Sequence, residues 1–135
     1  VGIATVQEID EINIFQASHL AIIRAIDSLK IKAQHVLIDG KFIPKQNLDN
    51  NSKMRFKVPA TAVIQGDLKC LSIAAASILA KVFRDRLMIN LDSDFPGYGF
   101  AKHKGYPTSK HTEALASLGI TEHHRRSFKP VGLYL

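Results

Sequence analysis

Two short apolar runs in this chain each lead into a turn that holds an aspartate beside a glycine. The first is VLI at 36–38, followed by Asp39, and the second is AVI at 62–64, followed by Gln-Gly and Asp67. Apolar, β-branched runs of this length indicate buried strands, and acids that leave such strands lie where open α/β sheets build their sites. Close carboxylates repel each other unless a cation or a proton lies between them. In a chain of net charge +6, the pattern indicates a divalent metal and a phosphate-bearing partner.

Helices are predicted on both sides of these strands. The first helix is predicted over residues 8 to about 30, and the second over about 72 to 90. A third, short helix is predicted to begin at a cap on Thr108 or Ser109, to run through about 118 and to end at Gly119. The strands are predicted at 36–38 and 60–65, on either side of a polar loop. The apolar stripe of the first helix is broken only by Gln16; it consists of Ile9, Ile12, Leu20, Ile23, Ala25 and Ile26.

The predicted sheet is too small to stand alone. Two strands rarely form a stable sheet by themselves, so the apolar helix stripe and the buried strands imply partners that the sequence does not contain. The expected architecture is therefore an incomplete α/β domain with two parallel strands and flanking helices. We expect one partial domain over residues 1–135, including a helical and loop region from about 92 to 135.

Charge and composition limit the partners. Residues 40–58 carry five basic side chains against one acidic, and residues 101–135 carry six against two. Two basic segments suit a polyanion that crosses the surface, although a solvated surface has the same composition. The single Cys70 allows no internal disulfide and is typical of a reducing cytosol, so we expect a cytoplasmic protein. No apolar run reaches the length of a membrane span, and no membrane partner is expected.

Longer motifs resemble a known family. They are EIDEIN at 8–13, VLIDG at 36–40, GDLKCLSIAAASILAKVFRD at 66–85, FPGYGFAKHKGYPT at 95–108 and TEHHRRSFKPV at 121–131. In this order they resemble bacterial ribonuclease HII, the type 2 ribonuclease H, over nearly all of residues 1–131. The resemblance implies a ribonuclease H-like α/β fold and a monomer when complete. It also implies an endoribonuclease, dependent on Mn²⁺ or Mg²⁺, that cuts the RNA strand of RNA–DNA hybrids and incises duplex DNA at embedded ribonucleotides.

The resemblance also assigns site residues. The family has four site carboxylates, and the third and fourth match Asp39 and Asp67, which become the candidate catalytic residues and metal ligands. The opening segment, with the first three strands, an Asp-Glu pair and a Gly-Arg-Gly loop, is expected to be absent. Tyr106 matches a tyrosine that contacts the sugar at the RNA–DNA junction. The alternatives are that Asp39 belongs to a simple turn, that Asp67 caps a helix, and that Tyr106 packs under its own loop.

Basic side chains supply further candidates for substrate binding. His103 and Lys104 precede Tyr106 closely, and Lys81 shares a predicted helix face with Arg84. The basic residues of the polar loop could touch nucleic acid or simply keep the loop soluble; they are Lys45, Lys53, Arg55 and Lys57. The histidines show no paired spacing typical of zinc. A second interpretation is a catalytically inactive, basic nucleic-acid-binding fragment that lacks half of the carboxylate site.

Overall fold

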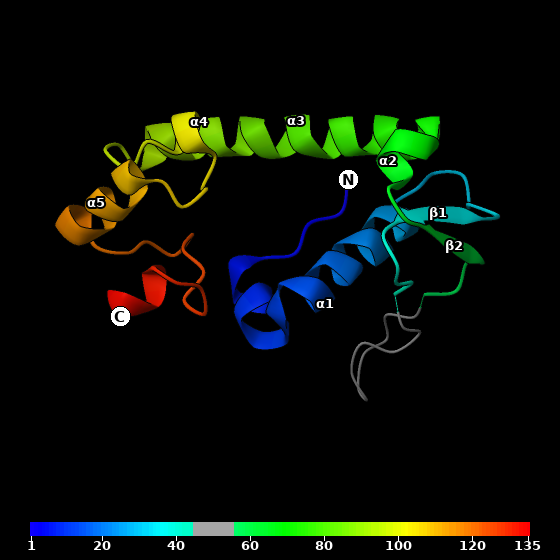
Figure 1. Ribbon diagram of the computed structural model, residues 1–135, viewed down its shortest axis with the longest axis horizontal. Helices are drawn as coiled ribbons and strands as arrows, with labels where there is room; N and C mark the ends of the chain where they lie inside the picture. The colour runs from blue at the N-terminus through cyan, green and yellow to red at the C-terminus, as the bar shows by residue number, and fades with distance from the viewer. Residues whose placement is uncertain (45–55) are drawn as a thin grey trace. The chain divides into compact units, whose positions relative to one another are not determined.

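The computed structural model of the chain describes residues 1–44 and 56–135, so the predicted contacts of Lys45, Lys53 and Arg55 lie outside the described residues. The elements, in chain order, are α1 (Val6–Asp27), β1 (Val36–Asp39), β2 (Ala60–Val63), α2 (Gly66–Lys69), α3 (Leu71–Asp94), α4 (Phe100–His103), α5 (Ser109–Leu118) and the 3₁₀ helix η1 (Val131–Leu133) (Figure 1). They form two compact units, Val1–Leu79 and Ala80–Leu135. The single domain expected from the sequence stays a prediction.

The first unit contains a two-stranded parallel sheet. β1 and β2 lie side by side (Figure 1), with Val36 opposite Ala60 and Asp39 opposite Val63. This arrangement, with its flanking helices, confirms the predicted α/β class. β2 ends two residues earlier than predicted, because Gln65 takes a left-handed conformation with φ of 57° and turns the chain into α2.

The first helix is interrupted at Asn13. This residue has φ of 66° and ψ of 164°, outside the helical region. Its Oδ1 accepts hydrogen bonds from the backbone N–H groups of Phe15, at 3.0 Å, and Gln16, at 3.2 Å, and so caps the second part of the helix. The buried residues of α1 all follow the interruption; they are Ala17, His19, Leu20 and Ile23. Of the predicted stripe, Ile9, Ile12 and Gln16 are half-buried and Leu20 and Ile23 are buried.

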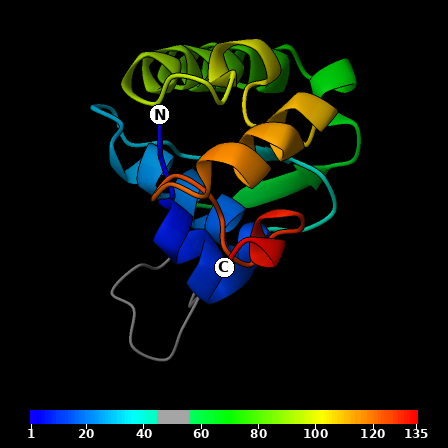
Figure 2. The ribbon, with the colours of Figure 1, turned by 90° about the vertical axis from the view of Figure 1, so that its left-hand side faces the viewer.

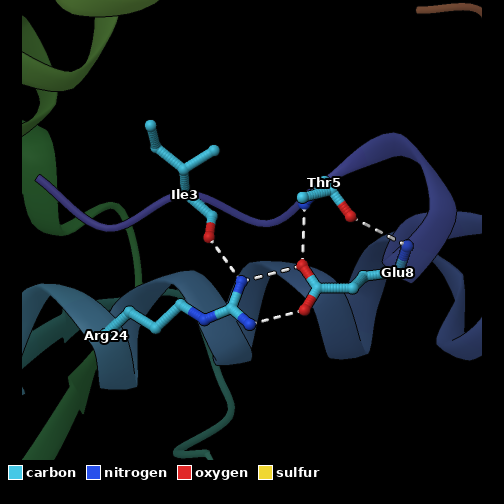
Figure 3. A network of polar contacts seen from close by, with 4 residues as sticks. All are labelled: Ile3, Thr5, Glu8 and Arg24. Atoms are coloured by element: carbon cyan, nitrogen blue, oxygen red, sulfur yellow. Dashed lines mark hydrogen bonds and ion pairs between the residues drawn. The ribbon is translucent and has the colours of Figure 1, made fainter. Parts of the chain in front are cut away.

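The second part of α1 packs on the sheet. Ile23, Ile38 and Phe56 form the buried cluster of this unit, and partly buried side chains surround it. The start of α1 is fixed by a capping box in which Thr5 accepts a hydrogen bond from the Glu8 N–H and Glu8 accepts one from the Thr5 N–H. Figure 3 shows that the same Glu8 carboxylate pairs with the Arg24 guanidinium, which also donates to the Ile3 carbonyl at 2.7 Å.

The second unit has its own core, built from loop, helix and tail. Tyr98, Phe100, Ala114, Leu115 and Val131 are its buried apolar side chains. The predicted caps of α5 are confirmed, since the Thr108 hydroxyl accepts from the third backbone N–H and Gly119 ends the helix. Val131 of η1 packs in the same core as Leu115 of α5. Figure 2 shows η1 (red) below α5 (orange).

α3 has many apolar side chains in contact with solvent. Leu71 is 87% exposed, Leu79 67% and Ile78 63%. Of its residues, only Ile73 is buried. The small side chains Ala75 and Ala76 are exposed as well, and Ala74 is half-buried. Within the described ranges, no helix has the length and apolar character needed to cross a membrane.

Candidate active site

Asp39 and Asp67 both leave the carboxyl end of the parallel sheet. Asp39 is the last residue of β1, and Asp67 follows β2 on the four-residue helix α2. Parallel strands place their carboxyl ends at the same edge, which is where α/β sheets bind ligands. Both acids are exposed to solvent. The turn predicted after the first strand and the helix predicted after Asp67 are therefore compatible with a ligand site at this edge.

Gly66 joins the two acidic residues. Its backbone N–H donates to Oδ1 of Asp39 at 2.7 Å, and the next residue in the chain is Asp67. Gly66 is buried, and a Cβ placed on it would lie 3.2 Å from the Asp39 Oδ1 and 2.6 Å from Cδ1 of Ile73. Close approach, and not backbone conformation, therefore requires glycine here. The hydrogen bond orients the Asp39 carboxylate beside the backbone that carries Asp67.

The donor chemistry of this pair suits a hard divalent cation. Carboxylate oxygens are the side-chain ligands that Mg²⁺ and Mn²⁺ prefer, and Mg²⁺ is commonly held by one or two carboxylates with water and substrate phosphates. The Gly66 N–H engages one oxygen of Asp39, and a carboxylate held in this way can present its second oxygen as a ligand. In the described part of the chain, no group of three or more His, Cys, Asp or Glu side chains could hold a metal. A divalent ion at Asp39 and Asp67 would therefore need further ligands.

Tyr106 lies in the second unit, on a tight loop between α4 and α5. Lys104 and Gly105 both have positive φ, 51° and 77°, and Thr108 then caps α5. The Tyr106 side chain is 58% exposed, and the Arg84 guanidinium carbon lies 5.4 Å from the centre of its ring. The alternative in which Tyr106 packs under its loop does not match this exposure. A displayed ring beside a cation suits contact with a sugar or base.

The three predicted basic contacts all have partners within the chain. The Lys81 ammonium pairs with the Asp85 carboxylate on the same face of α3, and this hydrogen bond lowers the pKa of Asp85. The Lys104 ammonium donates to the Ala101 carbonyl at 2.5 Å. Both ring nitrogens of His103 are also engaged, one with the Tyr98 carbonyl and the other with the Gly105 N–H. Their binding to substrate stays a prediction.

Sequence reasoning did not predict that three histidines of the second unit lie together. His103 Nε2 bonds to the Tyr98 carbonyl at 2.7 Å, and its Nδ1 accepts from the Gly105 N–H at 3.1 Å. Its ring stacks on that of His111, with centroids 4.4 Å apart. His111 and His124 are buried. The signal for His111 was present, because it shares the buried helix face of Ala114 and Leu115; no local pattern marked His124.

Comparison with known proteins now identifies the family. The family model described as Ribonuclease HII matches residues 2–131. The chain is 53% identical to a ribonuclease HII of Magnetococcus marinus and 52% identical to one of Paracoccus denitrificans, and in both cases it covers 97% of itself and 58% of the relative. It therefore spans less than two thirds of the length of these relatives. Its structure is similar to the crystal structure of the ribonuclease H2 from Pyrococcus horikoshii, with a TM-score of 0.71 and 25% identity over 96% of this chain and 64% of that one. On the strength of these matches and of the motifs, the chain belongs to the ribonuclease HII family.

Proposed function

We propose that this chain is the part of a divalent-metal-dependent endoribonuclease that supplies two of its site carboxylates. The substrates would be RNA–DNA hybrids and duplex DNA with embedded ribonucleotides. The observation that carries the proposal is the 2.7 Å hydrogen bond from the Gly66 N–H to Asp39, which joins the two acidic strand ends within a family match over residues 2–131. The net charge of +6 suits a polyanionic substrate.

Asp39 and Asp67 would hold Mn²⁺ or Mg²⁺ with acids outside this chain. When bound, such an ion activates water and neutralises charge on the leaving oxygen of a phosphodiester. The part of Asp39 is to present a fixed oxygen, because the Gly66 N–H restrains the other one. Asp67, whose side chain is exposed on α2, would add a second negative charge beside the ion.

Tyr106 would stack on a sugar near the scissile junction. Its loop is held by backbone hydrogen bonds, while its ring is 58% exposed, so little entropy is lost when it contacts a ligand. Lys104, His103 and Lys81 would lie along the phosphate backbone. Lys81 would exchange its exposed contact with Asp85 for a phosphate, which costs little because surface ion pairs are weak.

The test uses a completed enzyme, made by joining this chain to the part of the Magnetococcus marinus relative that it does not span. Asp39→Asn and Asp67→Asn should each abolish Mn²⁺-dependent cleavage of a duplex with one ribonucleotide, while binding of the hybrid persists. Asp94→Asn, at the exposed end of α3, is the matched control and should cleave normally. Near-normal turnover by either site variant would reject the metal-ligand assignment.

A second candidate function is nucleic-acid binding without catalysis by this chain alone. It is favoured by the absence, among the described residues, of a third side chain that could complete a metal site. The chain alone should then bind the ribonucleotide-containing duplex with an affinity that falls steeply with salt, and should leave it uncut in Mn²⁺. Cleavage by the chain alone would rule this out.

We also propose that the completed protein is monomeric and cytoplasmic. Cys70 is a free thiol, as expected in a reducing compartment. Light scattering of the completed enzyme would test the monomer, and fractionation of cells that express it would test the compartment.

A further inference from the structure

Two buried histidines that the proposed chemistry does not use lie behind the Tyr106 loop. His111 on α5 is 7% exposed, and His124 in the tail is 5% exposed. Their Nε2 atoms are 3.1 Å apart. One hydrogen bond can form between two imidazole nitrogens only if one carries a hydrogen and the other does not. The neighbours of the remaining ring nitrogens decide which one does.

The backbone fixes the tautomer of His124. Its Nδ1 lies 3.0 Å from the Thr121 backbone N–H, which can only donate. His124 Nδ1 is therefore an acceptor, and the neutral ring carries its hydrogen on Nε2. This Nε2–H then donates to Nε2 of His111. The Thr121 hydroxyl, 2.8 Å from the same Nδ1, is a second donor to it.

The tautomer of His111 follows from that of its partner. Because His111 accepts at Nε2, its own hydrogen lies on Nδ1, which is 3.2 Å from the Tyr106 carbonyl oxygen. A directed series of hydrogen bonds thus runs from the Thr121 N–H through His124 and His111 to the Tyr106 carbonyl. The other end of this residue is held as well, since the Tyr106 N–H donates to the His103 carbonyl at 2.9 Å.

We propose that His111 and His124 are positioning residues for Tyr106. This proposal rests on the proposed contact between Tyr106 and the substrate sugar. The pair restrains the Tyr106 carbonyl together with the Thr108 N–H, which donates to the same oxygen at 2.9 Å, while the ring stays exposed beside Arg84. The neutral form of both imidazoles is required. An added proton would place an N–H of His111 opposite the His124 Nε2–H, or an N–H of His124 opposite the Thr121 N–H.

The surroundings favour that neutral form. Burial lowers the pKa of both His111 and His124, and each ring is disfavoured as a cation by the proximity of a further histidine. The titratable groups that face the pair are His103, whose ring stacks on His111, His123, which also opposes a charge on His124, and the phenol Tyr98, whose ring is 5.3 Å from that of His124.

The first test needs no activity. Two-bond ¹H–¹⁵N spectra of the imidazoles in this chain should show His124 protonated at Nε2 and His111 at Nδ1, and the opposite assignment would overturn the proposal. His111→Asn keeps a donor near the Nδ1 position, whereas His111→Gln moves it toward Nε2. Amide order parameters at Tyr106 should stay near 0.85 in the Asn variant and fall toward roughly 0.6 in the Gln variant. Equal order in the two variants would also overturn it.

The second test uses the completed enzyme. The kcat of the Gln variant should be roughly tenfold to a hundredfold lower, with little change in KM, because misplacement of a contacting group by about 1 Å lowers the rate on this scale. The kcat of the Asn variant should be close to that of the unchanged enzyme. His123→Gln, a histidine outside the pair, is the matched control. If the Tyr106→Ala enzyme cleaves the junction normally, the proposed sugar contact is wrong, although the spectra can still support the series of hydrogen bonds. If Tyr106→Ala is impaired and the Gln variant is not, the positioning proposal fails alone.

Discussion

Substituting alanine for Gly66 should disturb the candidate active site through contact with Ile73 and Asp39. The new Cβ would lie 2.6 Å from Cδ1 of Ile73, about 1 Å inside the ordinary carbon–carbon separation, and Ile73 is only 7% exposed, so it cannot simply turn into solvent. Overpacking of this kind costs about 1–3 kcal/mol. The Asp39 Oδ1, 3.2 Å from the same Cβ, must also move, and this weakens its bond with the Gly66 N–H.

The measurements are urea unfolding and Mn²⁺ binding. We expect Gly66→Ala to lower the free energy of unfolding by about 1–3 kcal/mol. We also expect it to weaken Mn²⁺ binding by the completed enzyme roughly tenfold or more, as when an outer contact of a metal ligand is lost. Leu68→Ala is the matched control, because Leu68 is on the same helix and 79% exposed, and its effect should stay within about 0.5 kcal/mol. Unchanged stability and metal affinity in Gly66→Ala would refute the reasoning.

Two further predictions concern pH. The Arg24 guanidinium lowers the pKa of Glu8 to about 2 from 4.5, so the ion pair's contribution to the free energy of unfolding is complete above pH 4.5 and should be lost as the pH falls toward 2. Because both side chains are partly exposed, we expect urea unfolding to show a loss of about 1–2 kcal/mol. Glu8→Gln should remove this pH dependence. This prediction would be contradicted if the free energy of unfolding of Glu8→Gln fell at low pH as much as that of the unchanged protein. Burial lowers the pKa of His124 to about 4 from 6.5, so the unfolded chain binds more protons between these values and stability should fall by about 3 kcal/mol as the pH drops through that window. Thermal melts that are flat from pH 6.5 to 4 would argue against a buried neutral His124.

The sequence alone was sufficient for the features that depend on neighbouring residues. The apolar runs at 36–38 and 62–64 indicated strands because β-branched side chains favour extended backbone, and Thr108 and Gly119 marked the ends of α5 because capping is decided within one turn. Asp39 and Asp67 were recognisable as site candidates because each follows such a strand.

Tertiary structure decided the contacts between residues far apart in the chain. The Gly66 N–H and the Asp39 carboxylate are 27 positions apart, and His111 and His124 are 13 apart; no periodicity within one segment encodes such pairs. Asn13 shows the same limit locally, because its positive φ interrupts α1 while the residue types predicted a continuous helix. Residue type and spacing thus set which elements form. The orientation of a carboxylate or the tautomer of a ring depends on which distant backbone group packs against it, because hydrogen bonds act only at short range and in a defined direction.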